Sequence, residues 1–278
     1  MKTLQISHPA SGGPVHSVDV PMLGLGVFRM SDAEVEEAVS TALAAGYRHI
    51  DTAALYANEA AVGRAIAAAA VPRSQIHITT KLWRDARSTA DVLNGFEASR
   101  AALGVAVVDL YLVHAPVAEG SREAVWRGME QLLEQGSVRA IGVSNHGLHH
   151  LRELLAFAQI GPAVNQLELT PYLQRRELVA FCRAQGIALT AYSPLTKGEK
   201  LDAPELLQVS GRLRRTPAQI LLRWGLEQGY IVIPKSKTPS RIRENGAIFD
   251  FALPEDVREQ MAQWDDHLVT GWDPVREP

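Results

Sequence analysis

Residues 46–83, GYRHIDTAALYANEAAVGRAIAAAAVPRSQIHITTKLW, contain the unit from which most of the chain is built. Two largely apolar runs, 46–52 and 76–83, are predicted strands, and the alanine-rich segment 58–70 between them is a predicted helix. Strands that are apolar throughout are typical of parallel sheets, whose strands are buried on both faces. This stretch therefore predicts a β-α-β unit.

The same alternation continues along the chain. Further strands are predicted at 107–116, 138–145, 163–169, 187–194, 230–236 and 247–251. Further helices are predicted at 31–46, 89–104, 122–136, 146–158, 175–186, 216–229 and 254–264. Several helices end on glycine, and several begin at a capping residue, namely Ser31, Asn58, Thr89, Ser121 and Thr216. Eight strand–helix units without a linker predict an α/β fold, a (β/α)8 TIM barrel forming one domain over residues 1–278.

The N-terminal segment is predicted to lie outside this repeat. Residues 4–20 contain two β-prone stretches around the turn sequence SGGP, which predicts a short β-hairpin. The main alternative fold, a doubly wound open sheet, would carry a glycine-rich fingerprint between a strand and a helix. Gly24-Leu25-Gly26 lacks the third glycine, and no helix follows it directly, so the barrel is favoured.

Composition and charge are those of an ordinary globular protein. The 278 residues are 46% apolar, and the net charge of −3 provides no basic face for nucleic acid or anionic lipid. The single cysteine, Cys182, excludes an intrachain disulfide and fits a reducing compartment. No signal sequence and no apolar run of about 18 residues is visible. We expect a cytoplasmic monomer that binds neither nucleic acid nor membranes.

Seven polar residues stand where predicted strands end: Asp51, Lys81, His114, Asn145, Gln166, Tyr192 and Lys235. Parallel barrels place their chemistry at the C-terminal ends of the strands. We therefore expect these side chains to converge on one site.

Three of these residues, together with Tyr56, form a set suited to carbonyl reduction. A lysine ammonium favours the phenolate of a neighbouring tyrosine, so Lys81 is expected to lower the pKa of Tyr56 and make it a usable proton donor. Asp51 would keep the lysine charged, and His114 could hydrogen-bond a carbonyl oxygen. A cofactor would supply the hydride. Each residue alone has a structural explanation, such as a loop cap for Asp51, and only their joint placement favours catalysis.

The later strand ends carry groups suited to a nicotinamide cofactor. Ser144, Asn145 and Gln166 offer hydroxyl and amide groups for a carboxamide, and Tyr192 offers a ring for stacking. The loop IPKSKTPSRIREN, residues 233–245, combines basic and hydroxyl side chains with a helix start, which predicts a phosphate site. A solvated basic loop is the alternative interpretation.

The chain resembles the aldo-keto reductase superfamily over almost its whole length. GYRHIDTAALYANEAAVG (46–63) resembles the first family signature and IPKSKTPSRIRENGAIFDF (233–251) the last, while VVDLYLVHAP (107–116) and VNQLELTPYLQ (164–174) resemble the middle ones. The short loops and C-terminus look most like the bacterial branch that contains the 2,5-diketo-D-gluconate reductases. The resemblance implies metal-free reduction of aldehydes and ketones, including keto-sugars or diketo acids, with NADPH favoured over NADH.

The resemblance also implies a role for each site residue. The catalytic tetrad maps onto Asp51, Tyr56, Lys81 and His114, with Tyr56 as the proton donor. Nicotinamide-side cofactor contacts map onto Gly26, Val27, Ser144, Asn145, Gln166, Tyr192, Ser193, Pro194 and Leu195. Contacts to the 2′-phosphate, its neighbours and adenine map onto Lys235, Ser236, Thr238, Arg241, Glu244 and Asn245. Substrate contacts map onto Phe28, Trp83, His114, Ala115 and Trp272.

Two positions depart from the family pattern, and two other functions stay open. Ala115 stands where the family commonly has tryptophan, which predicts a wider substrate pocket, and Thr170 replaces a common histidine. A regulatory barrel that senses cofactor occupancy with little turnover is one alternative. A metal-dependent hydrolase is another, but it needs clustered histidines and carboxylates at strand ends. His149 and His150 are adjacent in one predicted helix, which disfavours the hydrolase.

Overall fold

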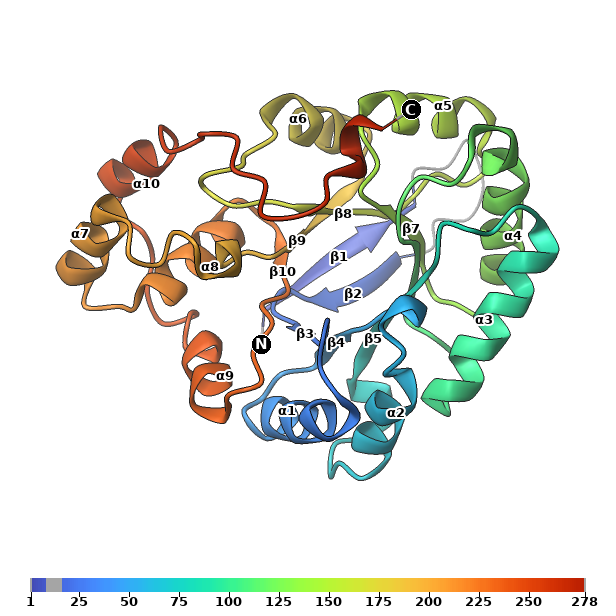
Figure 1. The fold of residues 1–278 in the computed structure, drawn as a ribbon, viewed down its shortest axis with the longest axis horizontal. Coiled ribbons are helices and arrows are strands. Elements are labelled where there is room, and N and C mark those ends of the chain that lie inside the picture. The colour runs from blue at the N-terminus through green and yellow to red at the C-terminus, as the bar shows by residue number, and fades with distance from the viewer. Residues whose placement is uncertain (1, 9–16, 278) are drawn as a thin grey trace.

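The computed structural model describes residues 2–8 and 17–277, in which eight parallel strands form the barrel (Figure 1). These strands are β3 (Leu25–Gly26), β4 (His49–Asp51), β5 (His77–Leu82), β6 (Leu110–Val113), β7 (Ile141–Ser144), β8 (Val164–Glu168), β9 (Ala188–Tyr192) and β10 (Ile231–Val232). They are hydrogen-bonded in chain order from β3 to β10. Parallel bridges from Leu23 to Val232 and from Gly26 to Lys235 join the two edges and close the barrel.

Helices surround the strands, largely where the sequence predicts them. They are α1 (Asp32–Ala44), α2 (Glu59–Ala67), α3 (Thr89–Leu103), α4 (Arg122–Glu134), α5 (Leu148–Phe157), α6 (Arg176–Ala184), α7 (Pro204–Leu213), α8 (Pro217–Glu227), α9 (Pro239–Gly246) and α10 (Glu255–Met261). In α1, Ser31 and Glu34 form a capping box, and Val35, Val39 and Leu43 are buried along one face. No helix in the described part of the chain is long and apolar enough to cross a bilayer.

The predicted hairpin lies across one end of the barrel (Figure 1). β1 (Thr3–Ser7) pairs antiparallel with β2 (Ser17–Pro21), whereas the SGGP turn falls outside the described residues. Ile6 and Val20 belong to one buried cluster with residues near the starts of barrel strands, such as Leu110. The hairpin therefore covers the N-terminal end of the barrel and leaves the loops after the strands free to form a site.

The structure corrects parts of the predicted element order. Residues 247–251 do not form a strand, because side chains of α8 take their carbonyls: Gln219 donates to Ala247 and Arg223 to Ile248. The eighth strand is the two-residue β3 instead. Helix α7 lies in a segment for which no helix is predicted, and Ser88 rather than Thr89 caps α3.

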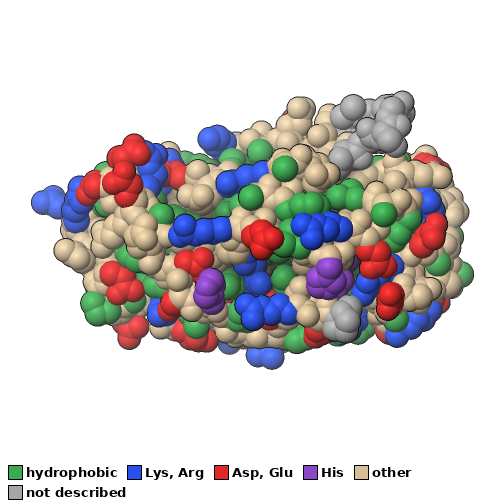
Figure 2. Space-filling model, turned by 90° about the horizontal axis from the view of Figure 1, so that it is seen from above, with side chains coloured by type: hydrophobic (Ala, Val, Ile, Leu, Met, Phe, Trp, Pro, Cys, Tyr) green, Lys and Arg blue, Asp and Glu red, His purple; other side chains and the backbone are tan. Residues whose placement is uncertain are grey.

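Charged side chains of both signs are interspersed on the side of the molecule seen from above in Figure 2. This arrangement agrees with the small net charge of −3. It resembles an ordinary solvated surface on that side.

Two buried histidines at the starts of neighbouring strands make folding stability depend on pH. His49 of β4 and His77 of β5 are register partners, with ring centroids 4.8 Å apart. Burial lowers the pKa of both, that of His77 well below its usual range, and the nearby His49 ring adds to the effect. The unfolded chain takes up protons below about pH 6.5 that the folded protein resists, so stability falls as the pH drops through that value.

When the pH is lowered from about 7 to about 5, we expect the free energy of unfolding to fall less in His77→Leu than in the wild type. The substitution removes one group that takes up a proton in the unfolded chain. Urea unfolding at a series of pH values measures this. His267→Asn is the control, since the His267 side chain is 77% exposed. A His77→Leu protein with the wild-type pH dependence would contradict the assignment.

Candidate active site

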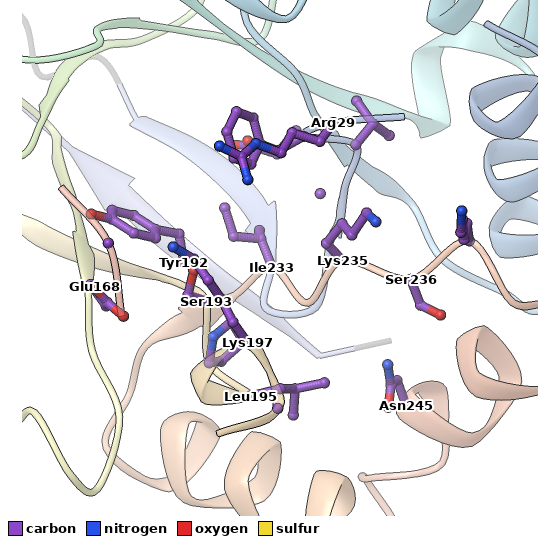
Figure 3. A pocket seen from close by; sticks show the side chains of 18 of the residues that line it. Arg29, Glu168, Tyr192, Ser193, Leu195, Lys197, Ile233, Lys235, Ser236 and Asn245 are labelled. Atoms are coloured by element: carbon purple, nitrogen blue, oxygen red, sulfur yellow. The ribbon is translucent and has the colours of Figure 1, made fainter. Parts of the chain in front are cut away.

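Loops that follow the barrel strands surround a cavity of about 960 Å³ (Figure 3). Six of the seven predicted strand-end residues line it: Asp51, His114, Asn145, Gln166, Tyr192 and Lys235. Tyr56 lines it as well. Lys81 does not, since its side chain is fully buried. Lys81 therefore does not reach the cavity surface, and it contacts the cavity-lining residues Asp51 and Tyr56 from behind the wall.

A buried ion pair stands behind that wall. Lys81 Nζ donates to Asp51 Oδ1 at 2.5 Å and to the backbone carbonyl of Thr52 at 2.8 Å. The Lys81 and Asp51 side chains are 0% and 3% exposed. Burial alone would lower the pKa of Lys81, but the charge of Asp51 and the neighbouring Tyr56 raise it above its ordinary value. Lys81 therefore stays an ammonium ion.

Tyr56 lies between this ammonium and the cavity. It ends the short 3-10 helix η1 (Ala54–Tyr56), and its hydroxyl lies 3.5 Å from Lys81 Nζ. The expectation that Tyr56 has a lowered pKa is wrong in its net direction, because burial raises this pKa and the Lys81 charge only opposes the rise. The phenol therefore keeps its proton at neutral pH and can offer it to an oxygen in the cavity.

His114 faces Tyr56 as a neutral imidazole. Its ring lies edge-on to Tyr56 and Trp83, with centroid distances of 5.6 and 5.3 Å. Burial, and to a lesser extent the charge of Lys81, lowers the pKa of His114 to about 3. A neutral imidazole can hydrogen-bond a carbonyl oxygen in the cavity, and at neutral pH it has no acidic proton to compete with that of Tyr56.

The polar groups predicted for the nicotinamide side share one hydrogen-bond network with the residues predicted to be catalytic. Asn145 Nδ2 donates to the His114 carbonyl at 3.0 Å, and Asn145 Oδ1 accepts from the Tyr192 hydroxyl at 2.8 Å. Gln166 Nε2 donates to Asp51 Oδ2 at 2.8 Å. The two Asp51 oxygens thus serve different partners, Lys81 on one and Gln166 on the other. The remaining predicted members, Gly26, Val27, Ser144, Ser193, Pro194 and Leu195, also line the cavity.

The predicted phosphate loop forms another part of the wall. Lys235 and Ser236 lie along the segment after Ile233, with Asn245 projecting from α9 beside them (Figure 3). All six predicted residues of this region line the cavity: Lys235, Ser236, Thr238, Arg241, Glu244 and Asn245. Within the described residues, neither Lys235 nor Arg241 forms an ion pair, whereas Lys237 pairs with Glu34 at 2.7 Å. The side chains of Lys235 and Arg241 are therefore available to bind an anionic group of a ligand.

Aromatic side chains form the remaining wall. Phe28 packs against Tyr56 with ring centroids 4.9 Å apart, and the ring centroids of Trp83 and Trp272 are 6.2 Å apart. These residues line the cavity, as predicted for Phe28, Trp83 and Trp272. Ala115 does not line it, because its methyl group is 0% exposed. Ala115 therefore lies outside the cavity lining in this structure, and its contact with substrate stays a prediction.

Several residues that line the cavity are not predicted from the sequence, among them Arg29, Leu55, Glu168 and Lys197. Glu168 lies two positions after Gln166 on β8, and the two-residue alternation of a strand places both on one face. That signal could have identified it. Arg29 and Lys197 have φ values of 55° and 50°, and no simple pattern predicts such loop conformations.

Comparisons with known proteins find a family model and relatives that match most of the chain. The model of the aldo/keto reductase family matches residues 22–268. The uncharacterized oxidoreductase YtbE of Bacillus subtilis (strain 168) is 42% identical over 96% of this chain and 98% of its own length. The glyoxal reductase of the same organism is 43% identical over 88% of this chain and 89% of its own length. The structure of a Bombyx mori aldo-keto reductase in complex with NADP is 34% identical, has a TM-score of 0.85, and covers 91% of this chain and 92% of its own.

We expect Asp51→Asn to lower the free energy of unfolding by about 3–5 kcal/mol, because it leaves a buried ammonium without its counter-ion. Urea unfolding at neutral pH measures the change. The matched control is Asp32→Asn, which breaks an ion pair with Arg64 whose side chains are 58% and 54% exposed, and its effect should be much smaller. Equal losses in the two variants would contradict the view that burial makes the Asp51 pair costly to break.

Proposed function

The chain belongs to the aldo/keto reductase family, and on that basis we propose that it reduces aldehydes and ketones to alcohols with NADPH. The observation that carries the proposal is the Tyr56 hydroxyl, held 3.5 Å from a buried lysine ammonium at the wall of the cavity. A protonated hydroxyl beside a fixed positive charge suits the protonation of an oxygen that gains negative charge during reduction.

Tyr56 supplies the proton in this proposal. The carbonyl oxygen would lie between the Tyr56 hydroxyl and the neutral His114 ring, which together polarise it. When bound, the nicotinamide supplies the hydride. As charge develops on the oxygen, the proton leaves the Tyr56 hydroxyl, and the Lys81 ammonium stabilises the phenolate that remains. Asp51 keeps Lys81 charged and in place through the 2.5 Å contact.

The residues of the cavity fit a phosphorylated nicotinamide cofactor. Lys235 and Arg241, which lack ion-pair partners among the described residues, would hold the 2′-phosphate with Ser236. Thr238 does not cap α9 with its side chain, so the backbone amides of Ser240 and Arg241, which follow Pro239, can also donate to a phosphate. The amides of Asn145 and Gln166 would hold the carboxamide, and the Tyr192 ring would stack on the nicotinamide. The NADP complex of the Bombyx mori structure supports this choice of cofactor.

The aromatic wall supports compact or flat carbonyl compounds as substrates. Phe28 and Trp272 are 41% and 48% exposed, so a substrate can cover them. The name of the glyoxal reductase relative supports small aldehydes as substrates, while keto-sugars and diketo acids are further candidates.

We propose that the chain works as a single-domain monomer in the cytoplasm.

A regulatory barrel that binds the cofactor with little turnover is the second candidate, but the geometry around Tyr56 favours catalysis. Such a sensor would need the cofactor residues and not the buried pair of Lys81 and Asp51. Across residues 2–8 and 17–277, no cluster of three or more His, Cys, Asp or Glu side chains is suited to a metal ion, so nothing favours a hydrolase.

Tyr56→Phe should lower NADPH-dependent carbonyl reduction by at least about a hundredfold, because it removes the proton donor. Absorbance of the reduced nicotinamide measures turnover, and fluorescence titration should show cofactor binding largely retained. Tyr111→Phe is the matched control, since it removes a buried hydroxyl that has no hydrogen-bond partner in the described chain. Substantial turnover by Tyr56→Phe would overturn the proposal.

Arg241→Ala should weaken NADPH binding by about tenfold to a hundredfold and leave NADH binding nearly unchanged, because a charge-assisted contact to phosphate is lost. Titration calorimetry with both cofactors measures the difference. Arg243→Ala, on the same helix but outside the cavity lining, is the control. If Arg241→Ala weakens both cofactors equally, Arg241 does not recognise the phosphate.

A further inference from the structure

Asn58 occupies a helix-cap position without capping its helix. It precedes α2 with φ −127° and ψ 11°, and its side chain accepts no hydrogen bond from the helix amides. Asparagine at this position usually accepts from an amide of the first turn. Asn58 is 2% exposed, so its side chain is committed to other buried contacts.

The Asn58 amide instead holds the turn that follows β3. Its Nδ2 donates to the carbonyl of Val27 at 3.0 Å and to that of Met30 at 3.4 Å. One amide group therefore brackets Phe28 and Arg29, the two residues at the tip of the turn. Asn58 Oδ1 accepts from the Thr52 hydroxyl at 2.9 Å, which fixes the orientation of the amide.

The bracketed turn has a strained backbone. Arg29 has φ 55°, in the left-handed region that residues other than glycine seldom adopt. A conformation of this kind persists only where surrounding contacts hold it. The backbone bond from Val27 N to the Asp51 carbonyl, at 3.2 Å, anchors the start of the turn, and Asn58 holds both sides of its tip.

The turn carries a part of the cavity wall that contacts the proton donor. Val27, Phe28 and Arg29 line the cavity, and the Phe28 ring packs on the Tyr56 ring at 4.9 Å. The Thr52 carbonyl accepts from Lys81, while the Thr52 hydroxyl donates to Asn58. A continuous set of hydrogen bonds therefore joins the buried ammonium to the turn.

We propose that Asn58 is a positioning residue, which holds the turn of residues 27–30 so that Phe28 stays on Tyr56 and Arg29 faces the cavity. The inference rests on the proposed carbonyl reduction, since its kinetic effect is read in that reaction. Lys81 and Asp51 contact each other directly, and the Asn58 amide group that holds the turn is not part of that contact. Loss of the amide should therefore impair substrate binding more than proton transfer.

Asn58→Asp tests this by replacing the amide donor with a carboxylate oxygen of the same size, which repels both carbonyls. We expect KM for a carbonyl substrate to rise by about tenfold, with kcat within about threefold and an unchanged pH profile of kcat. Trypsin cleavage after Arg29, followed by mass spectrometry, should become at least about fivefold faster, because cleavage follows the population of the opened turn.

Gln174→Glu is the matched control. Gln174 Nε2 also donates to backbone carbonyls, those of Pro171, Met261 and Ala262, but Gln174 does not line the cavity. It should keep the wild-type KM and cleavage rate after Arg29. If Asn58→Asp does not fold, Asn58→Ser removes the same donor with a smaller side chain.

Three results would overturn the inference: unchanged cleavage after Arg29 in the Asn58 variant, a loss confined to kcat, or equal effects in Gln174→Glu. Failure of the proposed function is a separate result. In that case the wild-type protein reduces no carbonyl compound with NADPH, and the cleavage rate alone decides whether Asn58 holds the turn.

Discussion

The ion pair between Lys81 and Asp51 is the interaction on which the site depends, because it fixes a full positive charge behind a tyrosine in a buried place. The two side chains are 0% and 3% exposed, so water does not screen this charge. A buried ion pair adds little to stability by itself, since the desolvation of both groups offsets their attraction. Its value lies in what it does to Tyr56, whose proton becomes easier to release than burial alone would allow.

The barrel makes this pair possible by bringing neighbouring strand ends together. Asp51 ends β4 and is the register partner of Thr79 on β5. Lys81 lies two residues further along β5, on the same face as Thr79, and its long side chain reaches Asp51. Gln166, from β8 across the barrel, reaches the second oxygen of Asp51 at 2.8 Å. The residues proposed for proton transfer and those proposed for the cofactor are consequently one network, and a shift of Asp51 would disturb both.

Much of the architecture could be predicted because buried parallel strands and their polar ends leave a clear pattern in the sequence. Strand β3 could not be predicted, since two residues carry no periodicity. The apolar run at 247–251 has the sequence pattern of a strand, but two of its carbonyls accept hydrogen bonds from the side chains of Gln219 and Arg223 instead. The direction in which the Tyr56 pKa shifts also could not be predicted from the sequence, because it depends on how deeply the ring is buried. The position of Ala115 behind the wall likewise depends on packing, which a family pattern does not reveal.

The most direct test of the account is the pH dependence of kcat for carbonyl reduction by the wild-type protein, under conditions where the chemical step limits the rate. The proton donor must be protonated, and burial raises the pKa of Tyr56, while that of His114 is lowered to about 3. The account predicts a level kcat between about pH 6 and pH 9. An inflection near the ordinary histidine pKa that vanishes in His114→Gln would contradict it, because His114 would then be the group that titrates with the reaction.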